Sequence, residues 1–125
     1  MRIPYADTDF FLALLKSDDW LKESATRIYR RHRESIWTSG WAIAELLLVA
    51  EEFKMDPERL VADIFEIAAV RDANKETLKG AAHLMKRHGM STFDALHAAS
   101  CGDDVIVSSD SVYDALGLPR IKLGQ

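Results

Sequence analysis

The stretch from Ser91 to Asp110 constrains the fold of this chain more than any other. Its first half favours a helix, because Ser91 is a good N-cap residue and apolar side chains follow at helical spacing until Gly102. Residues 105–107, Val-Ile-Val, are a β-branched run of the kind found in buried parallel strands. Asp110 follows where this strand should end. Since ligand sites in open α/β sheets lie beyond the carboxyl ends of the strands, Asp110 is a candidate site residue.

Composition indicates an ordinary soluble protein. The chain has 125 residues, a usual length for one domain with one core, and we expect residues 1–125 to form a single domain. The net charge of −4 argues against non-specific coating of nucleic acid but leaves room for a local basic patch. Cys101 is the single cysteine, which fits a reducing cytoplasm. The N-terminus lacks a long apolar run, and the apolar run at 41–50 is too short to span a bilayer, so we expect no membrane partner.

Short strand patterns alternate with helix patterns along the chain. We expect strands at residues 3–6, 36–38, 68–70, 105–107 and 119–123, the third being weakly marked. We expect helices at about residues 10–15, 18–33, 41–53, 57–67, 74–88 and 92–101, with a helical turn at 112–116. This alternation predicts an α/β fold with three layers, α/β/α, around a central and mainly parallel sheet.

Several acids have an ordinary structural explanation. Asp7 follows the first strand and can cap the next helix, and Asp9 is a first-turn acid that the helix dipole favours. Asp94 stands three residues after Ser91, as in a capping box, and Asp110 can cap the turn that follows it. These explanations remain open for each acid taken alone.

Glu45 has no such explanation. It lies in the middle of a helix among Ile43, Leu46 and Leu47, and a helix this apolar is expected to be largely buried. An unpaired buried carboxylate costs several kcal/mol or gives up its charge. Glu45 therefore needs a cation, a hydrogen-bond donor or a route to water.

Taken together, the acids suggest a metal site. Asp7 and Asp110 both follow strands of a parallel sheet, and Glu45 and Asp94 come early in helices that can face the same edge. Converging carboxylates repel one another unless a hard cation lies among them, and oxygen ligands favour Mg²⁺ or Mn²⁺ over zinc. The histidines show no metal-type pairing. His97 shares a helix face with Asp94, where an Asp–His hydrogen bond is as reasonable as a catalytic role.

These motifs resemble the PIN domain, and the closest kin would be the small VapC-type toxins of prokaryotic toxin–antitoxin pairs. The resemblance rests on Asp7-Thr8 after a strand, Glu45 in an apolar helix, the run DALHAA from Asp94, and Ser108-Ser109-Asp110, and it spans nearly the whole chain. It implies a metal-dependent endoribonuclease in which Asp7, Glu45, Asp94 and Asp110 hold Mg²⁺ or Mn²⁺. It also implies an RNA substrate, a small antitoxin protein as partner, and a homodimer.

Three further residues enter through this resemblance. Ser108 matches a small hydroxyl residue two positions before the last acid, and Asp114 lies where members often carry another acid. Asp9 is a departure, because many relatives have a neutral or small residue there, and an additional carboxylate could crowd the site. We assign Asp9, Ser108 and Asp114 to a supporting role around the four acids.

The implied reaction is hydrolysis by a metal-activated water. Such a site lowers the pKa of the bound water, which attacks phosphorus in line and leaves a 5′ phosphate and a 3′ hydroxyl. RNA then needs cationic anchors, and Arg27, Arg30, Arg31 and Arg33 are the candidates, with Tyr29 able to stack on a base. The alternative is a solvated helix end whose cations suit the helix dipole. The tryptophans at positions 20, 37 and 41 are expected in the core.

Two other functions stay open on the sequence. A PIN-like module could bind RNA or a protein without cutting it, and would then bind no divalent metal. A different acid-cluster enzyme, a Mg²⁺ phosphohydrolase, would act on small phosphate esters and ignore RNA. A phosphotransfer receiver is less suitable, because it needs a lysine on a late strand and Lys122 has the wrong setting.

Overall fold

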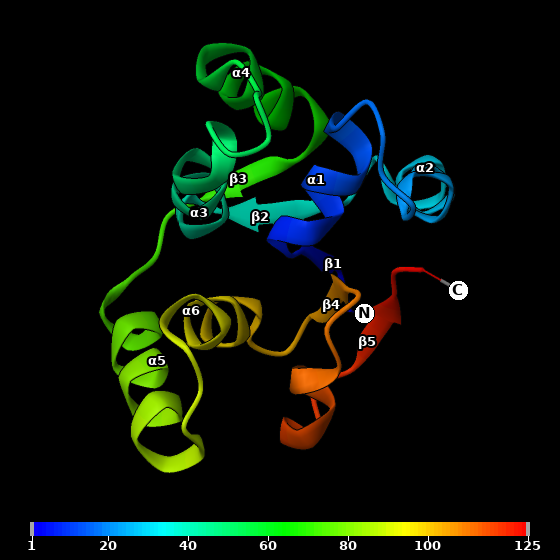
Figure 1. The fold of residues 1–125 in the computed structure, drawn as a ribbon. Coiled ribbons are helices and arrows are strands. Elements are labelled where there is room, and N and C mark those ends of the chain that lie inside the picture. Colours follow the sequence, from blue (N-terminus) through cyan, green and yellow to red (C-terminus); the bar gives the residue numbers. More distant parts are fainter. Residues whose placement is uncertain (1, 125) are drawn as a thin grey trace.

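A parallel sheet forms the centre of the computed structural model, which describes residues 2–124. Its strands are β1 (Pro4–Ala6), β2 (Trp37–Ser39), β3 (Ala69–Arg71), β4 (Val105–Ser108) and β5 (Arg120–Lys122). They lie in the order β3-β2-β1-β4-β5, and each neighbouring pair is parallel (Figure 1). The prediction of a mainly parallel sheet is therefore confirmed, and the weakly marked third strand is present at one edge.

Helices connect successive strands. They are α1 (Thr8–Leu15), α2 (Lys22–His32), α3 (Gly40–Ala50), α4 (Pro57–Ile67), α5 (Lys75–His88), α6 (Thr92–Cys101) and the 3₁₀ helix η1 (Ser111–Leu116). Local signals explain several of their ends, since Asp56 and Asn74 accept backbone N–H bonds as caps and Gly89 closes α5 at a φ of 63°. In the part of the chain that the structure describes, no helix has both the length and the apolarity needed to cross a membrane.

Two predicted helices are shorter than expected. The helix predicted from residue 18 begins at Lys22, because the Asp19 carboxylate accepts the Leu21 N–H and holds the preceding residues in a turn. The helix predicted to residue 53 ends at Ala50, and Lys54 shortly after it adopts a left-handed φ of 55°. Both differences are local and leave the order of elements unchanged.

The sheet separates two hydrophobic clusters. Ala6 and Val107 belong to the cluster covered by α1, α2, α3 and α4, whereas Tyr5 and Ile106 belong to the cluster covered by α5, α6 and η1 (Figure 1). Neighbouring residues of a strand point to opposite faces, so β1 and β4 each supply side chains to both clusters. This is the predicted three-layer α/β/α arrangement.

Some apolar side chains lie outside these clusters, contrary to expectation. Helix α3 is only partly buried, with Leu48 72% and Leu47 43% exposed, because one side of the helix faces away from the sheet and its neighbours. Trp20 is 84% exposed in the turn before α2, so its expected core position is wrong. Trp37 is in the core as predicted, and Trp41 is partly buried against the second cluster.

Candidate metal centre

A pocket of about 370 Å³ opens beside the carboxyl ends of β1 and β4. Asp7 and Asp110 reach it from the ends of these strands, and Glu45 and Asp94 reach it from the middle of α3 and the first turn of α6. The full lining is Asp7, Thr8, Asp9, Leu12, Glu45, Val49, Asp94, Ser109 and Asp110. The structure thus brings the four acids selected from the sequence to one place, because parallel strands end at the same edge of the sheet.

Asp7 is the most buried of these acids, with 6% exposure. It is the N-cap of α1, where Oδ1 accepts the Thr8 N–H at 2.7 Å, so the capping explanation holds as well. Its Oδ2 accepts bonds from the Ser108 hydroxyl at 2.8 Å and the Tyr113 hydroxyl at 3.2 Å. Burial raises the pKa of Asp7, although the charge of His97 and the bond from Ser108 act in the other direction.

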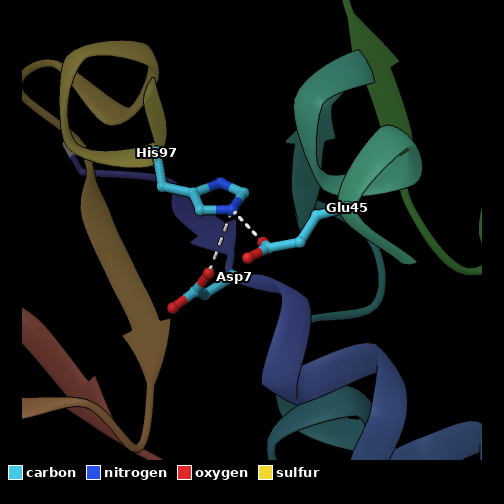
Figure 2. Close-up of side chains that lie close together, drawn as sticks. All are labelled: Asp7, Glu45 and His97. Carbon is cyan, nitrogen blue, oxygen red and sulfur yellow. Dashed lines mark hydrogen bonds and ion pairs between the residues drawn. The ribbon is translucent and has the colours of Figure 1, made fainter. Parts of the chain in front are cut away.

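Glu45 is held by two donors. Its Oε1 accepts a bond from the Thr8 hydroxyl and lies 2.8 Å from His97 Nε2 (Figure 2). Burial opposes ionisation of Glu45, but the bonds from His97 and Thr8 outweigh it and lower its pKa below the ordinary value. The hydrogen-bond donors that Glu45 requires are therefore His97 and Thr8.

His97 is a site residue that the sequence argument missed. Its side chain is fully buried, with Nε2 3.3 Å from Asp7 Oδ1 as well as 2.8 Å from Glu45. One ligand atom of each of these three residues lies within 4.8 Å of the others (Figure 2). Burial lowers the pKa of His97, but the bond to Glu45 and the charge of Asp7 raise it above the ordinary value. The sequence suggested a hydrogen bond between His97 and Asp94, whereas the structure places His97 Nε2 against Asp7 and Glu45.

Asp94 and Asp110 are held less tightly. The Asp94 Oδ1 lies 3.5 Å from the Tyr113 hydroxyl, and the side chain of Ser91 makes no capping bond, so the capping box has no support. Asp110 is exposed, and its Oδ1 caps η1 by accepting the Val112 N–H at 2.9 Å. The capping explanation therefore holds for Asp110, which also lines the pocket.

The three supporting residues differ in position. Ser108 donates to Asp7 and accepts the Asp110 N–H at 3.0 Å, so it joins two acids. Asp9 lines the pocket, and its Oδ2 accepts the Ser109 N–H at 2.8 Å. Burial, together with the charge of Asp7, raises the pKa of Asp9 to about 6. Asp114 does not line the pocket, because Arg120 holds both of its oxygens at 2.9 Å.

The predicted RNA anchors lie elsewhere. Helix α2 carries Arg27, Arg30 and Arg31, and Arg33 follows it, just before the chain enters β2. All four side chains are exposed, and none of them lines the acidic pocket. Their end of α2 precedes a strand, so it lies toward the amino ends of the strands, while the acids lie at the carboxyl ends. The cations in the last turn of α2 agree with the alternative of a solvated helix end.

The pocket suits a divalent cation. Its lining, as far as the structure describes the chain, contains five carboxylates and no Lys or Arg. Asp9 Oδ1 is buried without a hydrogen-bond partner, which leaves negative charge in the site unsatisfied. Carboxylate oxygens near an imidazole nitrogen are ligands for Mg²⁺, Mn²⁺ and related ions. The carboxylates of Asp7 and Glu45, which lie together at His97, could therefore hold a metal ion, and the remaining acids add charge that such an ion would balance.

Comparison with known proteins defines the class. A model of the PIN domain matches residues 5–116, most of the chain, so the protein belongs to the PIN domain family. The resemblance inferred from the sequence is confirmed at this level. No curated protein matches the chain.

Solved structures of similar fold are toxins and toxin–antitoxin complexes. VapC20 of Mycobacterium tuberculosis, described as a toxin that cleaves the sarcin–ricin loop, has a TM-score of 0.80 at 18% identity, with 95% of this chain and 98% of that chain covered. The FitAcB structure from Neisseria gonorrhoeae has a TM-score of 0.74 at 18% identity, with 96% and 97% covered. DNA-bound VapBC from Salmonella typhimurium has a TM-score of 0.70 at 19% identity, with 98% of this chain and 99% of that chain covered. At these identities the likeness shows the fold.

Proposed function

We propose that this protein is a Mg²⁺- or Mn²⁺-dependent endoribonuclease and the toxin of a toxin–antitoxin pair. One observation carries the proposal: carboxylates from four separate segments meet in one open pocket whose described lining contains no Lys or Arg. Burial raises the pKa of Asp7 and of Asp9, and the charge of a neighbouring carboxylate adds to this effect in both. A protein core does not assemble such a charge cluster for stability, so a cationic ligand accounts for it better.

The side chains divide the work as follows. Asp7, Asp94, Asp110 and Glu45 hold the cation, and the hydroxyls of Ser108 and Tyr113 keep Asp7 oriented. When bound, the ion would act as a Lewis acid that lowers the pKa of a water molecule and stabilises the charge that develops on the phosphodiester. Glu45, at the open side of the pocket and 27% exposed, is suited to orient the attacking water.

The partners are proposed from the similar structures and from the surface. VapBC of Salmonella typhimurium and the Klebsiella pneumoniae complex are toxin–antitoxin assemblies of the same fold, which supports a small antitoxin protein as partner. VapC20 is described as a toxin that cleaves the sarcin–ricin loop, which supports RNA as the substrate class. The exposed side chains of Leu47 and Leu48 on α3 support a homodimer.

The test compares three proteins in two assays. Wild type, Asp94→Asn and Asp103→Asn are titrated with Mn²⁺ by calorimetry and incubated with structured RNA plus Mg²⁺ or Mn²⁺. Asp103 is a matched control, because it is an exposed acid just after the other end of α6 and does not line the pocket. We expect Asp94→Asn to lose cleavage by at least about a hundredfold and Asp103→Asn to keep it, since only Asp94 contributes charge to the site.

The outcomes separate the alternatives. Metal binding with cleavage that Asp94→Asn abolishes supports the nuclease. A folded wild type that binds no Mn²⁺ overturns it and leaves a binding module. Metal binding with hydrolysis of small phosphate esters but not of RNA would identify a phosphohydrolase instead.

A further inference from the structure

His97 has contacts on both ring nitrogens, one with the acids of the pocket and one with a hydroxyl in the core. On one side Nε2 lies 2.8 Å from Glu45 Oε1 and 3.3 Å from Asp7 Oδ1. On the other side Nδ1 lies 2.7 Å from the Tyr5 hydroxyl, which in turn lies 2.7 Å from Ser39 Oγ. Ser39, Tyr5 and His97 are all buried, so the chain of hydrogen bonds runs through the core from the end of β2 to the pocket.

The position of Ser39 shows that its hydrogen bond to Tyr5 replaces the capping bond expected of a serine at the start of a helix. Ser39 is the N-cap residue of α3, where a serine hydroxyl usually accepts a backbone N–H bond of the helix. Its side chain makes no such bond and contacts Tyr5 instead. The capping bond is given up for a contact with Tyr5.

The direction of the hydrogen bonds follows from which groups carry protons. Burial raises the pKa of Tyr5 far above its ordinary value, so its hydroxyl keeps its proton. If His97 were neutral with its proton on Nδ1, the bare lone pair of Nε2 would face the Glu45 carboxylate at 2.8 Å, which is repulsive. With a proton on Nε2, Nε2–H donates to Glu45, and every group is satisfied in both the neutral and the doubly protonated ring. In the neutral ring Ser39 donates to Tyr5 and Tyr5 to Nδ1, and in the doubly protonated ring Nδ1–H donates to Tyr5 and Tyr5 to Ser39.

We propose that His97 is a positioning residue rather than a metal ligand: backed by Tyr5 and Ser39, its Nε2–H holds the Glu45 carboxylate against Asp7 so that both can bind one cation. The inference rests on the proposed metal site and adds the residues that preorganise it. Hydrogen bonds to ligating carboxylates fix their orientation, and removing such a partner typically lowers metal affinity about 10- to 100-fold. The bond uses only Oε1 of Glu45, and Oε2 accepts no hydrogen bond from the residues described.

Substitutions at two positions test the role. His97→Gln keeps an N–H donor near the place of Nε2, His97→Leu has similar bulk without a donor, and Tyr5→Phe keeps the ring but removes the hydroxyl behind it. By calorimetry with Mn²⁺ we expect His97→Leu to bind about 10- to 100-fold more weakly and His97→Gln to stay within about threefold of wild type. Tyr5→Phe should fall between them, because Nε2 then carries the proton for only part of the time. Circular dichroism confirms that each variant is folded.

If the role of His97 were only structural, the Gln variant, which keeps an N–H donor, and the Leu variant, which has none, would bind Mn²⁺ alike. Equal losses in the Gln and Leu variants, or no loss in either, would therefore overturn the inference. If His97→Leu does not fold, Tyr5→Phe and a second measurement decide it. In ¹⁵N-edited NMR of the Mg²⁺-loaded wild type, a proton on Nε2 of His97 is expected, and a bare or metal-bound Nε2 would overturn it.

The proposed function and this inference fail separately. A wild type that binds Mn²⁺ with the expected order of variants but cuts no RNA would remove the nuclease and keep the role of His97. Cleavage that survives with unchanged metal affinity in His97→Leu would keep the nuclease and remove the role of His97. A folded wild type without any divalent metal binding would overturn both.

Discussion

Replacing Asp9 by Asn should stabilise the metal-free protein at neutral pH. Asp9 is the additional acid of this chain, and its Oδ1 is buried without a partner. Burial and the charge of Asp7 raise its pKa from 3.8 to about 6. Between these two values the folded protein holds a proton that the unfolded chain has released. Stability from this group is therefore complete below about pH 3.8 and is lost as the pH rises through about 6.

The magnitude follows from the size of this difference. A pKa raised by about two units corresponds to at most about 3 kcal/mol of unfolding free energy that is lost by neutral pH. The substitution also weakens the bonds that Oδ2 accepts from Ser109, which offsets about 1–2 kcal/mol of the gain. We expect Asp9→Asn to be about 1 kcal/mol more stable than wild type at pH 7.5 in EDTA.

The assay is urea unfolding of EDTA-treated protein at pH 4 and pH 7.5, followed by circular dichroism. The advantage of Asp9→Asn should be present at pH 7.5 and absent at pH 4, where Asp9 of the wild type is protonated. Saturating Mn²⁺ should also remove the advantage, because the cation balances the carboxylate. Asp103→Asn, which changes an exposed acid, should match wild type at both pH values within about 0.5 kcal/mol.

One result would refute the reasoning. Suppose that Asp9→Asn is less stable than wild type at pH 7.5 without metal and that the dependence of the unfolding free energy on urea is unchanged. The charge of Asp9 then does not destabilise the folded protein. The site would then be balanced within the protein, and the electrostatic argument for a cation would lose its basis.

Two further predictions concern the groups around the acids. Tyr113→Phe removes a hydroxyl that donates to Asp7, and Mn²⁺ affinity by calorimetry should fall about tenfold; an unchanged affinity would mean that Ser108 alone orients Asp7. Arg120→Met removes a buried guanidinium that links the Ser108 carbonyl to Asp114, and the unfolding free energy in urea should fall by about 1–2 kcal/mol; an unchanged midpoint would contradict this.

The sequence determined the elements and the edge at which the acids meet. The Val-Ile-Val run before Asp110 predicted a buried strand, and the same order of strand, acid and helix recurs at Asp7. Capping preferences act over a few residues, so Asp56 and Asn74 marked helix starts correctly. Parallel strands end together, and from that rule alone Asp7 and Asp110 could be placed in one site.

The tertiary structure decided which side chains actually meet. Asp7 and Ser108 are 101 residues apart and Glu45 and His97 are 52 apart, so their contacts depend on the register of β1 and β4 and on how α3 and α6 pack against each other. Arg120 on β5 holds Asp114, and Trp20 in the turn before α2 is exposed, and the sequence pattern indicated neither. Local sequence preferences fix dihedral angles and helix ends, whereas the partner of a buried polar group is chosen by side chains that arrive from distant segments. For this reason the acids could be found in the sequence, and the histidine that joins two of them could not.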